Sequence, residues 1–248
     1  MKSNLTFVVL LCFCSCVFLV VQSAYCDVVD WNGSSGLYPD EITPQYSLFD
    51  TAINDPALSV GVLTLATNSD AELMGYSMNG ASLAMPAAPQ INFNMRMVSQ
   101  STSYPSLRTG AAVSITTQNN VGNVVYFGID EVFFLTTGGT RGPDAVIDTD
   151  SGFHAYRIEV EGLSSGSKIS LFQDDSPVLT HVLVADSGDY GNEPRIFFGN
   201  NTTVAHGTSE WTSFQHNAAA IPEPSSLSFA IFALILGGFA RINRRRIS

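Results

Sequence analysis

The sequence has few cysteines, and almost none lie in the part of the chain that can form a folded domain. It contains four in 248 residues, and Cys12, Cys14 and Cys16 all fall within an apolar stretch near the N-terminus. Only Cys26 remains beyond that stretch. A disulfide framework is therefore excluded, and so is a cysteine-ligated metal site.

Charged residues are also scarce, and basic residues are the scarcest. Only 13% of the chain is charged, and 11 lysines and arginines stand against 22 acidic residues. An acidic surface repels phosphate, so no nucleic-acid partner is expected. The hydrophobic share of 45% is enough for one sizeable core, which excludes a disordered chain.

The N-terminal residues have the pattern of a secretory leader. Lys2 precedes an apolar run over residues 5–21, which predicts a signal peptide at 1–23 with cleavage after Ser23. Cleavage after Cys26 is an alternative. A retained anchor helix is a second alternative, although the run is short of the roughly 20 residues that a bilayer span needs.

The C-terminal residues 221–248 contain three features in a fixed order. A triplet of Pro222, Glu223 and Pro224 comes first, and an apolar run of 14 residues follows at 227–240. As a helix this run is about 21 Å long, against a hydrocarbon core of about 30 Å, so it predicts a short transmembrane helix. A basic cluster over 241–246 follows and favours a cytoplasmic end. Its members are Arg241, Arg244, Arg245 and Arg246.

This arrangement resembles the PEP-CTERM sorting signal. The resemblance implies an exported protein that is membrane-anchored at first and is then processed near the triplet. The processing enzyme in that family is an exosortase, a membrane cysteine protease or transpeptidase, which releases the protein or attaches it at the cell surface. An ordinary C-terminal tail anchor is the alternative, because it needs the apolar run and the arginines but not the triplet.

Removing both ends leaves a markedly acidic segment, residues 27–220. It holds six basic and 21 acidic residues, a net charge of −15. Such a surface keeps a secreted protein soluble and can attract divalent cations.

The dominant hydrophobic period in that segment is two. Residues 90–98 alternate Ile91, Phe93, Met95 and Met97 with polar side chains, and residues 153–161 alternate in the same way. Helical periodicity of useful length is lacking. Further strands are expected at the following ranges: 60–66, 111–117, 124–135 with a break near Asp130, 168–172, 178–184, 195–199 and 211–215. The fold class expected is all-β, a two-sheet antiparallel sandwich or jelly roll.

Residues 148–184 carry a second resemblance. A strand with His154, Tyr156, Arg157 and Ile158, followed by a strand that ends in an acidic turn, resembles the central hairpin of concanavalin A-like and laminin G-like jelly rolls. The turn here is Asp-Asp-Ser without the usual glycine. VVDWNG and EWTSFQHNA also resemble segments of surface proteins of the same sorting class. The fold implied serves lectins, adhesion modules and glycosidases alike.

Known catalytic patterns are missing from the sequence. Glycosidases of this fold use E-x-D-x-x-E on one strand, but Gly128 stands where the first glutamate would be. Glu159 and Glu161 share a strand face, and we interpret them as a solvated face beside Arg157. No nucleophile elbow, zinc spacing or phosphate loop occurs. We therefore expect a protein that is not an enzyme.

One candidate metal site remains. Asp144, Asp148 and Asp150 lie at spaced positions in GPDAVIDTDSG, and Gly152 permits a sharp turn, as calcium coordination prefers. The alternative is that these aspartates hydrogen-bond to their own backbone in turns. Asp186 and Asp189 leave the same two interpretations open.

The function expected first is a surface or matrix module that binds glycan without catalysis, with extracellular polysaccharide as its partner. Exposed aromatics such as Trp31, Tyr38 or Trp211 could stack on sugars, or they could be core residues. The alternatives are a structural envelope or biofilm component without a discrete ligand, and a polysaccharide-active enzyme with a degenerate site.

Overall fold

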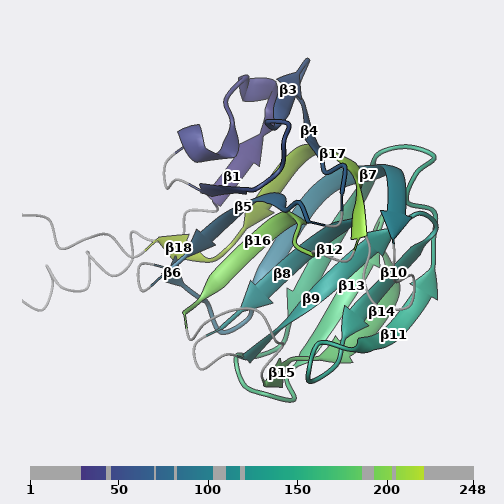
Figure 1. Cartoon of the computed structure of the whole chain (residues 1–248). Coiled ribbons are helices and arrows are strands. Elements are labelled where there is room, and N and C mark those ends of the chain that lie inside the picture. Colours follow the sequence, from purple (N-terminus) through teal and green to yellow (C-terminus); the bar gives the residue numbers. More distant parts are fainter. Residues whose placement is uncertain are drawn as a thin grey trace, which may run out of the picture.

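The protein is a sandwich of two antiparallel sheets (Figure 1). The computed structural model describes residues 29–42, 46–69, 71–80, 83–102, 110–117, 121–185, 193–202 and 205–220. The predicted signal peptide, sorting triplet, membrane segment and basic cluster lie outside these residues, as do Asp186 and Asp189. Within the described part of the chain, no helix has both the length and the apolar character to cross a membrane.

The first sheet, called sheet A here, contains the longest strands. Its order is β14-β13-β12-β7-β17-β4-β3, and β1 also pairs with β17. The strands are β1 (Val29–Asn32), β3 (Ala57–Ser59), β4 (Val62–Ala66), β7 (Gln90–Thr102), β12 (His154–Val160), β13 (Lys168–Gln173), β14 (Ser176–Val182) and β17 (Ala205–His216).

The second sheet, sheet B, has the order β11-β10-β9-β8-β16-β5-β2, with β15 on β9. Its strands are β2 (Ser47–Asp50), β5 (Met74–Asn79), β8 (Ala111–Thr116), β9 (Val121–Gly128), β10 (Glu131–Leu135), β11 (Arg141–Val146), β15 (Val184–Ala185) and β16 (Arg195–Asn200). A small pair of β6 (Leu83–Ala84) and β18 (Ala219–Ala220) lies at one end of the sandwich (Figure 1). The 3-10 turns η1 (Gly33–Ser35) and η2 (Pro39–Glu41) follow β1.

The core between the sheets follows the predicted alternation. Ile91, Phe93, Met95 and Met97 of β7 are all buried, while the residues between them face outward. The all-β two-sheet sandwich expected from the sequence is therefore confirmed.

The two sheets differ in their outward faces. Sheet A turns polar side chains outward from β7, β12 and β17. Sheet B is apolar on this side as well, where Ala112, Val124, Tyr126, Phe133 and Leu135 form a second buried cluster. This explains why β9 and β10 read as continuous apolar runs, which is typical of strands buried on both faces.

Two turns between strands contain aspartates with positive φ angles. The predicted break near Asp130 is confirmed, because this residue has a φ of 60° in the turn between β9 and β10. The Asp174-Asp175 turn also forms without glycine, with φ values of 48° and 64°. Aspartate tolerates the left-handed region better than most residues do.

No strand was expected around Asp144, where the segment GPDAVIDTDSG was interpreted as a candidate metal-binding segment. Residues 141–146 form strand β11, although they include a glycine and a proline. Because β11 is at the edge of sheet B, Pro143 does not need an N–H group for a neighbour on both sides.

Candidate functional site

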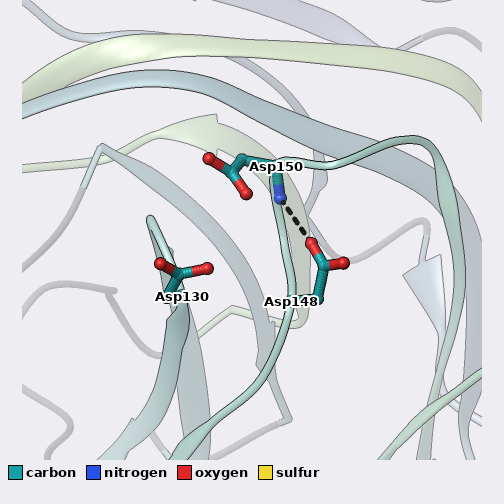
Figure 2. Close-up of side chains that lie close together, drawn as sticks. All are labelled: Asp130, Asp148 and Asp150. Atoms are coloured by element: carbon teal, nitrogen blue, oxygen red, sulfur yellow. Dashed lines mark hydrogen bonds between the residues drawn. The ribbon is translucent and has the colours of Figure 1, made fainter.

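Three aspartates meet where two connections of the sandwich approach each other (Figure 2). Asp130 lies in the β9–β10 turn, and Asp148 and Asp150 lie in the loop between β11 and β12. One carboxylate oxygen from each of the three lies within 4.8 Å of the others. All three are exposed, so water or a cation can reach them.

Thr149 holds these two connections together. Its side chain is fully buried, and its hydroxyl accepts a hydrogen bond from the Asp130 backbone N–H (3.0 Å) and donates to the Gly128 carbonyl (2.6 Å). Its own carbonyl accepts from the Met97 N–H at 2.8 Å. The positions of Asp148 and Asp150 relative to Asp130 are thus fixed through the residue between them.

The carboxylate of Asp148 already stabilises its own loop. It accepts from the backbone N–H groups of Asp150 (3.3 Å; dashed in Figure 2) and Ser151 (3.0 Å), and from the Ser151 hydroxyl. These hydrogen bonds hold the pKa of Asp148 below its ordinary value. The carboxylates of Asp130 and Asp150 have no protein partner among the described residues.

A histidine links this loop to the turn between β13 and β14. The Nδ1 of His154 lies 2.7 Å from Asp174, and its Nε2 lies 3.7 Å from Asp148. The hydrogen bond with His154 lowers the pKa of Asp174. Gln173 adds a second link, because its amide donates to the Asp148 carbonyl.

The structure brings together Asp148 and Asp150 of the three predicted ligands but places Asp144 elsewhere. Asp144 lies on β11 and accepts from Arg141 at 3.1 Å. Asp130 completes the group of three instead. The sequence marked Asp130 as a break in an apolar run and not as a metal ligand, and that break was the available signal.

Three glutamates on or beside β10 and β12 are held in ion pairs. Glu131 pairs with Arg141 at 2.6 Å, Glu159 with Arg157 at 3.0 Å and Glu161 with Lys168 at 2.8 Å. The side chains of Glu159 and Glu161 are 45% and 64% exposed, in agreement with a solvated face.

A pocket of about 330 Å³ lies on the outward face of sheet A. Because side chains alternate along a strand, its walls are the polar residues that lie between core residues on β1, β7, β12 and β17. Ala155 is the one alanine in its lining and leaves space among longer side chains. The remaining lining residues are Asn32, Asn92, Phe93, Asn94, Tyr156, Arg157, Asp175, Ser213 and Gln215.

Most of the polar groups in this pocket are uncharged. The side chains of Asn94, Ser213 and Gln215 have no hydrogen-bond partner within the described ranges, and those of Asn32 and Asn92 each use one oxygen. An amide offers two donors and an acceptor, and a hydroxyl offers both roles. The pocket can therefore bind a ligand that both donates and accepts hydrogen bonds.

The tryptophans considered as sugar-stacking groups are core residues. Trp31 and Trp211 are fully buried. Tyr38 is partly buried, and its hydroxyl bonds the backbone of Pro56 and Leu58. None of the three lines the pocket.

No protein-family model matches the chain, and no curated protein matches it. Solved structures do resemble it. One is the carbohydrate recognition domain of Emp46p in its potassium-bound form, with 14% identity over 75% of this chain and 97% of that chain and a TM-score of 0.48.

Two further similar structures have different functions. A lectin from Bauhinia forficata in complex with GalNAc shares 13% identity over 79% of this chain and 100% of that one, with a TM-score of 0.46. The alginate lyase Aly36B shares 11% identity over 81% and 100%, with a TM-score of 0.44. At such identities the similarity concerns architecture, so function has to be argued from this chain's own residues.

Proposed function

We propose that the protein is an exported surface or extracellular-matrix protein whose sandwich binds glycan without catalysis. The observation that carries this proposal is the pocket on sheet A, where neutral amide and hydroxyl groups without protein partners surround the space above Ala155. Sugar hydroxyls both donate and accept hydrogen bonds, which matches these groups.

The ion pairs of Glu131, Glu159 and Glu161 support the non-catalytic part of the proposal. A general acid has to deliver its proton to the scissile bond, whereas the carboxylate of each of these three glutamates contacts an arginine or a lysine of the protein itself. Release of sugar from any polymer by the purified protein would contradict this part.

Export and processing belong to the same proposal and rest on residues 1–23 and 221–248. In this account the leader is removed, an exosortase-type enzyme acts near Pro222, Glu223 and Pro224, and the apolar segment 227–240 anchors the chain until then. Mass spectrometry of the mature termini tests this directly. Native protein with both ends intact would contradict it.

Filling the pocket provides the direct test of glycan binding. Ala155 is exposed on β12, so the substitution Ala155→Trp is compatible with the strand while its indole occupies the pocket. We expect at least about tenfold weaker binding to whichever polysaccharide the parent protein binds in a panel of glucans, xylan, mannan and alginate.

Val98→Trp is the matched control, because Val98 is 48% exposed and follows Asn94 and Arg96 along the outward side of β7, outside the pocket. It should bind as the parent does. If the parent is silent toward the whole panel at millimolar sugar, the glycan proposal fails, and a structural component without a discrete ligand becomes the better account.

We further propose that Asp130, Asp148 and Asp150 bind calcium. Calcium takes several oxygen ligands, and three carboxylates on two connections supply part of such a set. Calcium at ten times its Kd should add about 1.4 kcal/mol to the free energy of unfolding, or roughly 3–6 °C in Tm, and a chelator should reverse the shift.

Asp130→Asn should abolish this calcium-dependent shift in Tm, and asparagine tolerates the positive φ at that position. Asp144→Asn removes the same charge from a residue that pairs with Arg141 instead, and it should leave the shift intact. A melting curve that ignores both calcium and chelator would count against the site.

A further inference from the structure

We infer that the pocket on sheet A selects uncharged sugar chains over polyanionic ones, and that Glu159 and Asp175 set this preference. The inference rests on the proposed glycan binding and names its ligand class. Its basis is the way in which the single cation of the pocket lining, Arg157, is neutralised.

Two acidic residues and a ring hold Arg157. Its Nε lies 3.0 Å from Glu159, and its Nη1 donates to Asp175 at 3.3 Å. The guanidinium carbon also lies 4.4 Å from the centre of the Phe172 ring. A guanidinium is the group that best binds a sugar carboxylate or sulfate, but here its charge and part of its donor set are already used.

The surroundings of the pocket add negative charge. Asp30 is exposed on β1, and its strand partner is Gln215 of the lining. Arg96, the next cation along the outward side of β7, pairs with Glu210 at 2.7 Å and lies over Phe153. The lining and its neighbours therefore repel a polymer that bears carboxylates. Among the described residues here, every cation near the pocket is already paired with an acidic side chain.

Neutral hydroxyl groups meet the opposite situation. The side chains of Asn94, Ser213 and Gln215 are uncharged and have no hydrogen-bond partner in the described part of the chain. A sugar hydroxyl can therefore bind to them without breaking an ion pair. A neutral chain such as a glucan or xylan also avoids the long-range repulsion from residues 27–220, which hold 21 acidic and six basic residues. Hydrogen-bonding capacity and charge thus point to the same ligand class.

The experiment compares the full-length chain, kept in mild detergent, with the variant Glu159→Gln/Asp175→Asn. Asparagine suits the positive φ of residue 175, and Glu159 is on an exposed face. Binding is measured to β-glucan and xylan, and to alginate and polygalacturonate, with a chelator present throughout to exclude calcium bridges. The control variant Asp144→Asn/Glu161→Gln removes the same number of charges outside the pocket.

We expect the parent to bind a neutral polymer at least about tenfold more tightly than either polyanion at moderate salt. In the double variant at 159 and 175, the ratio of neutral-polymer affinity to polyanion affinity should fall at least about fivefold, because the affinity for the polyanion rises. In the control variant this ratio should not change. The gain should weaken as salt rises, because a freed Arg157 on this open face is screened.

The outcomes separate the two proposals. Polyanion binding by the parent equal to or above neutral binding, or an unchanged ratio in the double variant, overturns the preference while glycan binding stands. Silence toward every polymer overturns both.

Discussion

Replacing Phe198 with alanine is expected to lower the free energy of unfolding by about 3–5 kcal/mol. Phe198 lies on β16 of sheet B and is fully buried. Its ring contacts five others, and these come from both sheets. They are Trp31 at 6.3 Å, Tyr46 at 5.9 Å, Tyr76 at 5.7 Å, Trp211 at 5.1 Å and Phe214 at 4.2 Å between centroids.

The loss of stability is large because the surrounding rings cannot move in to fill the space that the Phe198 ring leaves. The five rings come from β1, β5, β17 and the residue before β2, in both sheets, so a cavity of nearly the volume of a phenyl ring remains when Phe198 is truncated. For a domain of this size, Tm should fall by roughly 6–20 °C. Urea denaturation followed by tryptophan fluorescence measures the effect, since both tryptophans of the chain are in this cluster.

Phe49→Ala is the matched control. Phe49 lies on β2 at the edge of sheet B and is 40% exposed. The same truncation there should cost less than about 1 kcal/mol, because half-exposed surface leaves no closed cavity. Equal losses at both positions would show that the ring cluster is not the centre of stability.

The sequence predicted the strands whose two faces differ. Residues of β7 and β12 alternate strictly because one side meets the core and the other meets solvent, so their period was visible. Short strands such as β3 and β6 left no such signal. β11 was missed because Gly142 and Pro143 disfavour a strand except at an edge, and the sequence does not show which strand is at an edge.

The candidate metal cluster was predicted only in part for a related reason. Asp148 and Asp150 are neighbours in sequence, so their spacing could be read directly. Asp130 joins them through the fold, since the Thr149 hydroxyl bonds both its N–H and the Gly128 carbonyl. A long-range tertiary contact of this kind has no local sequence signature.

The pocket shows the same limit more strongly. Asn92 and Asn94 were visible as the polar side of a strand, but Gln215 and Ser213 reach them only because β17 pairs with β7 in a register shifted by a bulge after Trp211. A slip of one residue would exchange inward and outward side chains. Sequence alone thus predicted the polar face but not the arrangement that makes a pocket of it.

His216 gives the second large effect, a loss of stability in weak acid. It lies on β17 beside Tyr46 and Phe214, with ring centroids 5.9 Å and 6.5 Å away, and it is 1% exposed. Burial among these rings lowers the pKa of His216 to about 4.

The folded protein should therefore lose stability as the pH falls from about 6.5 to about 4. In that window the histidine of the unfolded chain, with an ordinary pKa of 6.5, takes up a proton that the folded chain excludes. The full difference corresponds to about 3 kcal/mol, present above pH 6.5 and lost below pH 4. Asp148 and Asp174, whose pKa values are lowered from 3.8, contribute to acid loss mainly below this window.

His216→Phe separates the two ranges, because it keeps a ring of similar size in the cluster and removes the titrating group. Urea unfolding at pH 7.5, 6, 5 and 4 should give a steep decline for the parent and a clearly shallower decline for the variant, in which His181, whose pKa is also lowered by burial, still titrates. The comparison uses the slope with pH, so a constant offset from altered packing does not affect it. A variant that declines as steeply as the parent would place the acid sensitivity in another group and return His216 to a purely structural role.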